Sequence, residues 1–544
     1  MTRSHFHNKH PPVAERLSPC HANMPRRDFL KSGIALGLSS TLPLALISRS
    51  DANHHPHPHE GSIDFLDRNM YIHDMEVLQH FEAGKNRRGD LQFMSRGAER
   101  FLFQLTSKGC SVYDISDPLR PSIINEGAFD AQQIQLAYNR KAGKWIVIAA
   151  QHSDPANVYP SAEYPQGRYD NPRIEDAWRD WKGLRGIVIW DATDPTDIRQ
   201  LSEYNTDGGD PSREVQEGMG VKESFYTGGK YCFLDTSPDN SFIHMESPLR
   251  YYSNAIQVID VEDPENPRFV SNAWLPGQRA GEEAAYRAWP EHGDKLSFTG
   301  LHSGTAVPVN IEDGGRYGYS AFGALGMVIH DFSRPESPQV VGHFDPPSKP
   351  GAIAMHTVDV TRIDARGIVL VEPEAVNPDC NEPQHPIWIV DVTDPARPRP
   401  ISQLPKPVPP PEAPYRDFCD KRGRFGTHAP PAWNAPGKVD LNLTMYPYFI
   451  AGLQCFDITN LARPTIAAYF IPPQAGNLED PGSYHRTVDH ILVEWDRNLI
   501  WAGTDSGVYL LSTPRLGEPI VDPMPVTEWS LPGSNIGHDA SEAG

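Results

Sequence analysis

Four histidines occupy equivalent places along the chain, each directly after a turn and before a run of β-branched or aliphatic residues. They are His302, His356, His428 and His485. Imidazole is the commonest neutral protein ligand of copper, iron and zinc, and separate repeats of a fold can hold several imidazoles in a fixed geometry. The pattern therefore predicts a metal site built from these four side chains, with copper or iron as the expected ion.

Further titratable groups accompany the histidines. Asp359 and Asp489 each follow a Thr-Val pair, and they either orient a ligating imidazole or bind neighbouring backbone. Glu223 and His490 are the candidates for acid–base catalysis, and we include both aspartates in the predicted catalytic set. The sequence contains no HExxH, paired CxxC, GxSxG or Walker motif, so the prediction rests on this constellation of side chains.

Short strands must position these side chains. Residues 356–404 contain four β-branched or aliphatic runs, HTVDV, GIVLVE, PIWIVDV and RPISQL, and none has a helical period. The turn between the last two runs carries Asp391 and Pro395. Aspartate hydrogen-bonds its own backbone in such turns, and proline cannot continue a central strand. A four-stranded unit of this kind cannot bury both of its faces alone.

The same run, aspartate and proline-marked turn recurs along the chain. Six copies end their run in an aspartate, namely Asp114, Asp191, Asp260, Asp331, Asp391 and Asp457, and a degenerate seventh copy reads GVYLLSTPRLGEP. Seven units, each long enough for four strands and a loop, predict an all-β fold, a seven-bladed β-propeller of four-stranded blades. The alternative, an extended solenoid, would have shorter and more regular coils. The first strand of a propeller blade lines the central channel, so the histidines are expected to converge there.

The run IWIVDVTDPARP resembles the LVIVD-repeat family of bacterial β-propellers, whose signature is an aliphatic strand, an aspartate and a proline-containing turn. The resemblance extends over residues 91–519. It implies the propeller fold, and it supplies no catalytic residues for this chain.

The first 52 residues are predicted to be an export signal. Arg26 and Arg27 stand in PRRDFLK before a short, serine-interrupted apolar segment, as in twin-arginine signal peptides. The apolar segment is too short to span a bilayer. We therefore expect export by the twin-arginine translocase to the periplasm or beyond, and no integral membrane span in the mature chain. The expected divisions are the signal peptide (1–52), a His-rich lead-in (53–89), the propeller (90–530) and a C-terminal tail (531–544).

Cleavage after Ala52 would expose a histidine-rich N-terminus containing His54, His55, His57 and His59. A free amine, two amides and a histidine at the third position form a square-planar nitrogen set that suits Cu(II) or Ni(II). The alternative is a solvated segment without a metal.

Composition restricts the partners. The formal net charge is −21, and no stripe of lysine and arginine follows the leader, so nucleic acid is not expected to bind. Cys380 and Cys419 flank a proline-rich linker and are the expected disulfide in an oxidising compartment.

These features favour an exported, metal-dependent redox enzyme that acts on a small molecule. Two alternatives remain, a non-catalytic binding scaffold that uses its rim loops, and a metal-free lyase or hydrolase that uses histidine and carboxylate as acid and base. Histidines that converge on one point would favour an enzyme, whereas scattered histidines, or a channel plugged by Trp and Tyr, would favour the scaffold.

Overall fold

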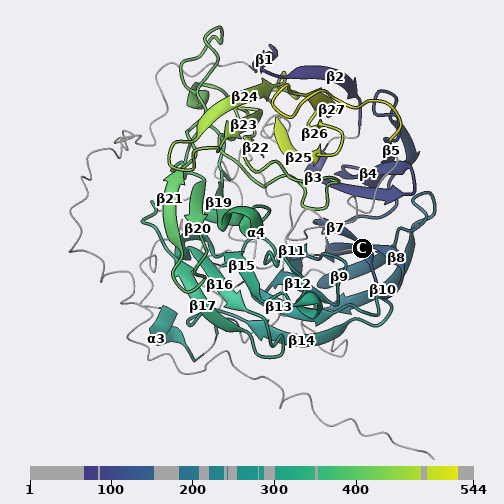
Figure 1. Cartoon of the computed structure of the whole chain (residues 1–544), viewed down its shortest axis with the longest axis vertical. Helices are drawn as coiled ribbons and strands as arrows, with labels where there is room; N and C mark the ends of the chain where they lie inside the picture. The colour runs from purple at the N-terminus through teal and green to yellow at the C-terminus, as the bar shows by residue number, and fades with distance from the viewer. Residues whose placement is uncertain are drawn as a thin grey trace, which may run out of the picture.

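The computed structural model describes residues 66–83, 86–151, 183–206, 220–237, 242, 254–279, 281–286, 300–349, 353–479 and 487–524. In this part of the chain, seven antiparallel sheets stand around a common axis (Figure 1). Its helices are short, namely α3 (Glu283–Tyr286), α4 (Ile363–Arg366), η4 (Ile311–Asp313), η5 (Gly323–Leu325) and η6 (Phe418–Asp420). The predicted seven-bladed β-propeller is confirmed.

The blades follow one another in sequence order. The first blade contains β3 (Asn86–Arg96), β4 (Glu99–Thr106), β5 (Gly109–Asp114) and β6 (Ser122–Asn125). The second contains β7 (Ile134–Asn139), β8 (Lys144–Gln151), β9 (Gly186–Asp191) and β10 (Arg199–Asn205). The third contains β11 (Val221–Phe225), β12 (Tyr231–Thr236), β13 (Ala255–Asp260) and β14 (Arg268–Ala273). The fourth contains β15 (Tyr317–Ala321), β16 (Met327–Asp331) and β17 (Gln339–Phe344). The fifth contains β18 (Ile353–Asp359), β19 (Ile368–Glu374), β20 (Trp388–Asp391) and β21 (Arg399–Gln403). The sixth contains β22 (Leu443–Pro447), β23 (Leu453–Asp457) and β24 (Thr465–Ile471) together with β1 (Tyr71–His73). The seventh contains β25 (Val488–Glu494), β26 (Leu499–Thr504) and β27 (Gly507–Ser512) together with β2 (Glu76–Phe81).

Strands from the N-terminal part of the chain complete the last two blades. β1 pairs with β24, and β2 pairs with β27. The propeller therefore includes β1 and β2, which the sequence divisions had placed in the lead-in before residue 90. Pairing between the two ends of a chain protects sheet edges and closes the ring.

The innermost position is irregular in two blades. The aspartate-ending strand is third from the axis in most blades, as β5 and β20 are. In the fourth blade this strand is β16, the second of only three, and a segment before β15 takes the inner place through a bridge between Ala306 and Tyr319. In the sixth blade it is β23, again the second strand. Both blades therefore face the axis with irregular backbone at the inner place.

The repeated aspartates form the predicted turns. All six accept a hydrogen bond through Oδ1 from the backbone N–H two residues further on, at 2.8–3.0 Å. The Thr393 hydroxyl and N–H lower the pKa of Asp391 because they stabilise its carboxylate.

These turns also join neighbouring blades. The hydroxyl of Ser202, on β10, donates to the carbonyl of Pro264 in the next turn at 2.7 Å, and Ser271, on β14, donates to Pro335 at 2.6 Å. At the corresponding place on β17 stands Gly342, where a Cβ would lie 1.9 Å from the carbonyl oxygen of Pro395. One repeated turn thus ends a strand and sets the spacing to the preceding blade.

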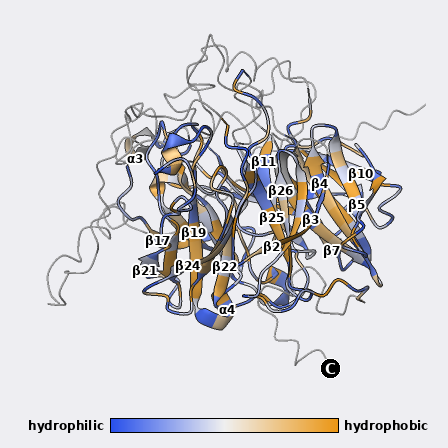
Figure 2. Cartoon of the chain, turned by 90° about the horizontal axis from the view of Figure 1, so that it is seen from above, coloured by the Kyte–Doolittle hydropathy of each residue, from blue (hydrophilic) through white to orange (hydrophobic). Residues whose placement is uncertain are grey.

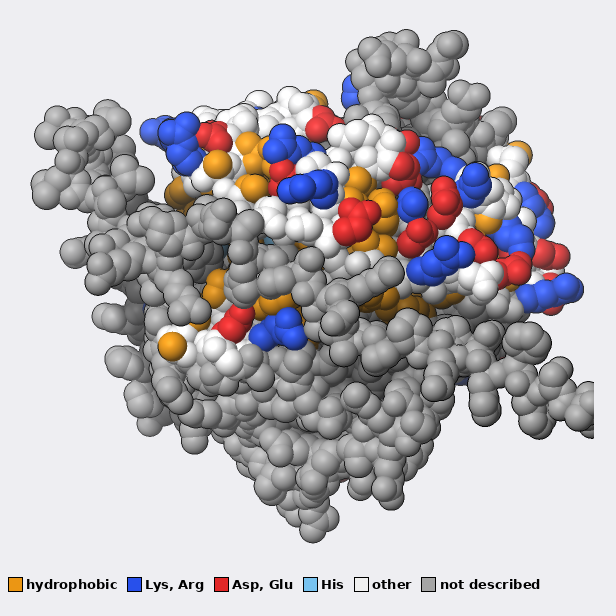
Figure 3. Space-filling view, turned by 90° about the horizontal axis from the view of Figure 1, so that it is seen from below, with side chains coloured by type: hydrophobic (Ala, Val, Ile, Leu, Met, Phe, Trp, Pro, Cys, Tyr) orange, Lys and Arg blue, Asp and Glu red, His pale blue; other side chains and the backbone are white. Residues whose placement is uncertain are grey.

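The hydrophobic core lies between the blades, because each sheet buries both faces against its neighbours (Figure 2). One cluster joins the third, fourth and fifth blades through residues such as Phe233, Phe332 and Val390. No helix of the described residues is long and apolar enough to cross a membrane. On the face in Figure 3, acidic and basic side chains are interspersed around apolar ones.

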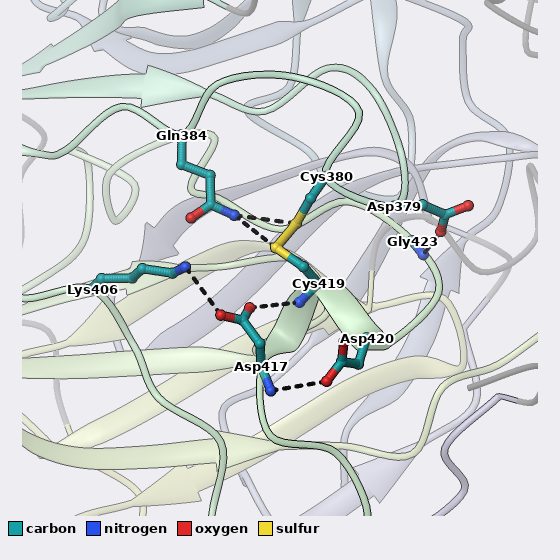
Figure 4. The surroundings of a disulfide bond; sticks show 8 residues. All are labelled: Asp379, Cys380, Gln384, Lys406, Asp417, Cys419, Asp420 and Gly423. Atoms are coloured by element: carbon teal, nitrogen blue, oxygen red, sulfur yellow. Dashed lines mark hydrogen bonds and ion pairs between the residues drawn. A yellow bond between two sulfur atoms is a disulfide. The ribbon is translucent and has the colours of Figure 1, made fainter. Parts of the chain in front are cut away.

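The predicted disulfide between Cys380 and Cys419 is present (Figure 4). It ties the loop after β19 to the segment before β22, and both thus belong to one covalent ring. The amide of Gln384 lies against both sulfur atoms, at 3.2 and 3.1 Å. Asp417 caps η6 by accepting from the N–H of Cys419 at 2.8 Å.

A buried ion pair closes the seam between the first and last blades. Arg100, on β4, is fully buried and pairs with Glu494, at the end of β25, and with Asp496 at 2.6 Å. Glu494 also accepts from the indole N–H of Trp501 at 2.8 Å. The two ends of the ring are thus joined by charge as well as by β2.

Replacing Arg100 should therefore weaken the closed ring. Removing one partner of a buried pair costs about 3–5 kcal/mol because the other charge stays buried and unpaired. We expect Arg100→Met to lower the free energy of unfolding by about this amount in denaturant titrations. Lys108→Met, which breaks an exposed pair with Glu126, is the control and should change it by less than about 1 kcal/mol. Equal effects of the two substitutions would show that the seam does not depend on this pair.

Candidate metal centre

Three of the four predicted histidines meet at the axis. The rings of His302 and His356 have centroids 4.9 Å apart, and those of His356 and His428 are 5.1 Å apart. All three side chains are buried. The fourth predicted ligand, His485, lies outside the described residues. Convergence of histidines was the outcome expected for an enzyme.

The irregular inner segments of the fourth and sixth blades carry two of these histidines. His302 precedes β15, and His428 lies between β21 and β22. Backbone outside a regular ladder can turn a side chain toward the axis where the alternation of a strand would not. The serine after His302 fixes its segment, because the hydroxyl of Ser303 donates to the carbonyl of His356 at 2.7 Å.

Three regular inner strands bulge at the site. The pairing register shifts between Val221 and Ser224 on β11, between Ile353 and Thr357 on β18, and between Val488 and His490 on β25. The shifted stretches contain Glu223, His356 and Asp489. A β-bulge re-aims side chains and is frequent beside functional sites, so the bulges account for the inward placement of these residues.

A carboxylate stands among the three imidazoles. Oε2 of Glu374, at the end of β19, lies 3.4 Å from Nε2 of His302 and 3.4 Å from Nε2 of His356. Its Oε1 lies 3.8 Å from Nε2 of His428 and 3.4 Å from Arg424. Glu374 was not among the predicted site residues, because the prediction covered only the first strand of each blade. The available signal was an acidic residue at the end of the fully buried run IVLVEPE.

An ion pair borders the cluster on β11. The ammonium of Lys222 pairs with Glu223 at 3.0 Å, donates to the carbonyl of His302, and lies 3.5 Å from Nε2 of His356. Glu223 itself approaches His356 Nε2 at 3.9 Å, and its side chain is 22% exposed. The predicted acid–base residue Glu223 thus belongs to the cluster. Its carboxylate is more exposed to solvent than those of Glu374 and Asp489.

The charges of the cluster follow from burial and proximity. Burial, and then the Lys222 ammonium, hold the pKa of His356 well below 6.5, so this imidazole is neutral at neutral pH. Burial alone would raise the pKa of Glu374, but the surrounding histidines outweigh it and hold that pKa well below 4.5. Nδ1 of His356 lies 2.5 Å from the Thr357 hydroxyl, which leaves Nε2 facing the carboxylate. The cluster therefore combines a neutral imidazole at His356 with an ionised carboxylate at Glu374.

The two aspartates that share a sequence context have different surroundings. Asp489 Oδ1 lies 3.1 Å from Nδ1 of His428, as expected for a group beside a ligating histidine. Asp359 instead accepts from the N–H of Thr361 at 2.9 Å, pairs with Arg362 at 3.2 Å and accepts from the Tyr446 hydroxyl. It contacts none of the described histidines. The predicted role of Asp359 in the site therefore has no geometric support, because its part of β18 lies beyond the bulge.

His490 extends the cluster toward the seventh blade. Its ring meets that of His428 edge-on at a centroid distance of 5.0 Å, and it is partly exposed. Ligand atoms of His302, His356 and Glu374 lie within 4.8 Å of one another, as do those of Glu223, His356 and His428, and those of His428, Asp489 and His490. Nitrogen and carboxylate oxygen donors of this kind suit divalent first-row metals.

The site lies at one end of the channel. β18 runs toward α4 and β19 runs away from it, so Glu374, the last residue of β19, lies at the end opposite α4, and His356 lies midway along β18. The segment after His428 fills the channel beneath them. The indole N–H of its Trp433 donates to the side chain of Gln135, and the ring packs on Phe225. A channel filled by such a side chain was the outcome expected for a binding scaffold.

The neighbouring Asn434 anchors this plug. Its amide donates to the carbonyls of Phe93 and Leu136, both at 3.0 Å. Trp433 and Asn434 thus form the floor of the site, and they do not separate the three histidines.

The disulfide-linked insertion after Glu374 begins beside the segment that carries His428, since the N–H of Ala375 donates to the carbonyl of Thr427 at 3.4 Å. Its Glu382 accepts from the N–H of Val376 at 2.6 Å and from the amide of Asn377 at 3.0 Å. Glu382 is partly exposed as a residue, but its carboxyl group is enclosed, and this burial raises its pKa to about 8.

The N-terminal histidines His54, His55, His57 and His59, and the twin-arginine leader, lie outside the described residues.

Comparisons with known proteins leave the function to the site itself. No family model and no curated protein matches the sequence, so the resemblance to the LVIVD-repeat family stays a prediction. Among solved structures, the periplasmic gluconolactonase PpgL of Pseudomonas aeruginosa is similar over 84% of this chain and 99% of that chain, at 12% identity and a TM-score of 0.40. This distance is too great for its activity to bear on this chain.

Glu382 should make stability fall as pH rises. Its folded pKa of about 8 lies above the ordinary glutamate value of 4.5, so the folded state keeps a proton that the unfolded state loses. Stability from this group is complete below about pH 4.5 and is lost as pH rises through 8. We expect Glu382→Gln to be more stable than the parent at pH 8 by on the order of 4 kcal/mol, and similar at pH 4.5. Denaturant midpoints over this range measure it, and parallel curves for the two proteins would contradict the assignment.

Proposed function

We propose that this protein is a metal-dependent oxidoreductase that acts on a small molecule, with the ion held by His302, His356 and Glu374. The observation that carries the proposal is the meeting of two imidazole nitrogens with one carboxylate oxygen, because Nε2 of His302 and Nε2 of His356 each lie 3.4 Å from Oε2 of Glu374. Metals of this class hold such ligands at about 2.0–2.2 Å, so two ligands of one ion lie about 3.0–3.4 Å apart at octahedral to tetrahedral angles. The spacing fits a shared ion.

Iron(II) is the ion that this donor set favours. Two histidines and one carboxylate on one side of a metal, with positions left for substrate, are typical of non-haem iron enzymes. Copper(II), which prefers a square-planar set of nitrogens, is the second candidate. The bound ion would supply the redox chemistry.

The protein groups around the ion have separable tasks in this proposal. Lys222, fixed by Glu223 and by the carbonyl of His302, would bind a negatively charged group of the substrate beside the ion. Glu223 is the accessible carboxylate and would accept a proton from the substrate. Trp433 and Asn434 would keep water from entering through the floor.

The cellular setting remains a proposal from the sequence. The twin-arginine pair Arg26 and Arg27 supports export in the folded state, which suits a protein that acquires its cofactor before export. The disulfide between Cys380 and Cys419 is compatible with an oxidising compartment.

A metal-free lyase or hydrolase is the second candidate. The observation that favours it is the Lys222 ammonium, 3.5 Å from Nε2 of His356, because a cation so close to a ligand nitrogen opposes a metal ion there. In that case Glu223, His356 and Lys222 would transfer protons directly.

Metal content distinguishes the two candidates. The parent, exported through its own leader or reconstituted with Fe(II) without oxygen, should hold at least one ion per chain by elemental analysis. His356→Asn and Glu374→Gln should lower ion affinity by about 100-fold or more, because each removes a donor. His80→Gln, on exposed β2, is the matched control and should bind as the parent does.

Circular dichroism and thermal unfolding would show that the variants keep the fold. A parent that binds neither iron nor copper after reconstitution would exclude the metalloenzyme. Loss of activity in His356→Asn from such a metal-free parent would then establish the acid–base candidate.

A further inference from the structure

We infer that the same end of the channel holds a second cation, bound by His428, Asp489 and His490, and that the centre is dinuclear. The inference rests on the proposed function, because it adds an ion beside the one that His302, His356 and Glu374 hold. No residue is common to the two groups, and each consists of two histidines and one carboxylate.

The contact between His428 and Asp489 has the form expected of two ligands. Nδ1 of His428 and Oδ1 of Asp489 are 3.1 Å apart, yet Nδ1 makes no hydrogen bond to any described residue. Both atoms can give a lone pair to a metal ion, the carboxylate oxygen directly and Nδ1 when it carries no proton. The separation falls within the about 3.0–3.4 Å expected for ligands of one ion.

The third ligand comes from the same bulged stretch of backbone. Asp489 and His490 are adjacent on β25, where regular alternation would send their side chains to opposite faces. The register shift between Val488 and His490 relaxes that alternation. Ligand atoms of His428, Asp489 and His490 all lie within 4.8 Å of one another as a result.

His428 lies between the two positions. One carboxylate oxygen, Oε2, faces His302 and His356, and the other, Oε1, faces Nε2 of His428. His428 has the same divided placement, since its Nε2 faces Glu374 and its Nδ1 faces Asp489. The His428 ring, with Asp489 at Nδ1 and the Glu374 carboxylate at Nε2, is therefore the group that lies between the two positions.

Counting bound ions tests the inference. We would titrate the full mature chain with Co(II) and with Mn(II) and measure ions per chain after desalting. The parent should bind two, whereas Asp489→Asn and His490→Asn should each bind one and keep the His302 position. His302→Asn should also bind one, and the His302→Asn/His490→Asn double variant none.

Asp359→Asn provides the matched control for Asp489→Asn. Both aspartates follow a Thr-Val pair, but Asp359 pairs with Arg362 and contacts none of the described histidines, so its variant should still bind two ions. Magnetic coupling offers a second readout. The Mn(II)-loaded parent should give a coupled paramagnetic resonance spectrum, and His490→Asn should give that of an isolated ion, which a purely structural effect would not produce.

The outcomes separate this inference from the proposed function. One ion per parent chain, lost in His302→Asn and kept in His490→Asn, would overturn the second position and leave the proposed enzyme intact. Such a result would make Asp489 only a positioning group for His428. No ion in the parent would overturn both.

Discussion

The aspartate turn at the end of one strand in six of the blades is the constraint on which the rest of the architecture depends. Each aspartate ties its carboxylate to the backbone two residues on, and the turn that follows offers a carbonyl to the outer strand of the preceding blade. Where Gly342 replaces the donor, the contact is so close that no Cβ would fit. This local geometry fixes the angle between neighbours. Repeated around the ring, it brings the inner strands of all blades to one axis, where their side chains meet.

The candidate site occurs where the repeat is broken. Two blades lack a regular strand at the axis, and the irregular segments there carry His302 and His428. Bulges on β11, β18 and β25 turn further side chains inward. An unbroken strand alternates its side chains, so it could offer the axis only every second residue. The departures from regularity thus place more donors at one point than a regular propeller could.

The sequence was sufficient for the fold, because the aspartate-ended runs state the repeat directly. It also predicted His302, His356 and His428, since residues at equivalent places of a repeat converge. Glu374 was beyond this reasoning, because it reaches the axis from the end of a second strand. Asp359 and Asp489 show the other limit. They share the same preceding dipeptide, but the bulge comes before Asp359 and includes Asp489, and a pairing shift of one residue reverses the face to which a side chain points.

The balance of charge decides how such a cluster can exist in a protein interior. Glu374 is buried and ionised, and burying a lone carboxylate is strongly unfavourable unless donors or cations surround it. Arg424 supplies one fixed cation at 3.4 Å, but the imidazole of His356 is held neutral, so protein groups compensate the carboxylates only in part. A divalent cation would complete this compensation and would use the nitrogen lone pair of the neutral His356 imidazole. Because the donors come from separate blades that are already locked together by their turns, the protein can arrange them before any ion binds. The same rigidity lets Lys222 remain close to His356, since its contacts with Glu223 and with the carbonyl of His302 hold it in place against the repulsion that an ion would add.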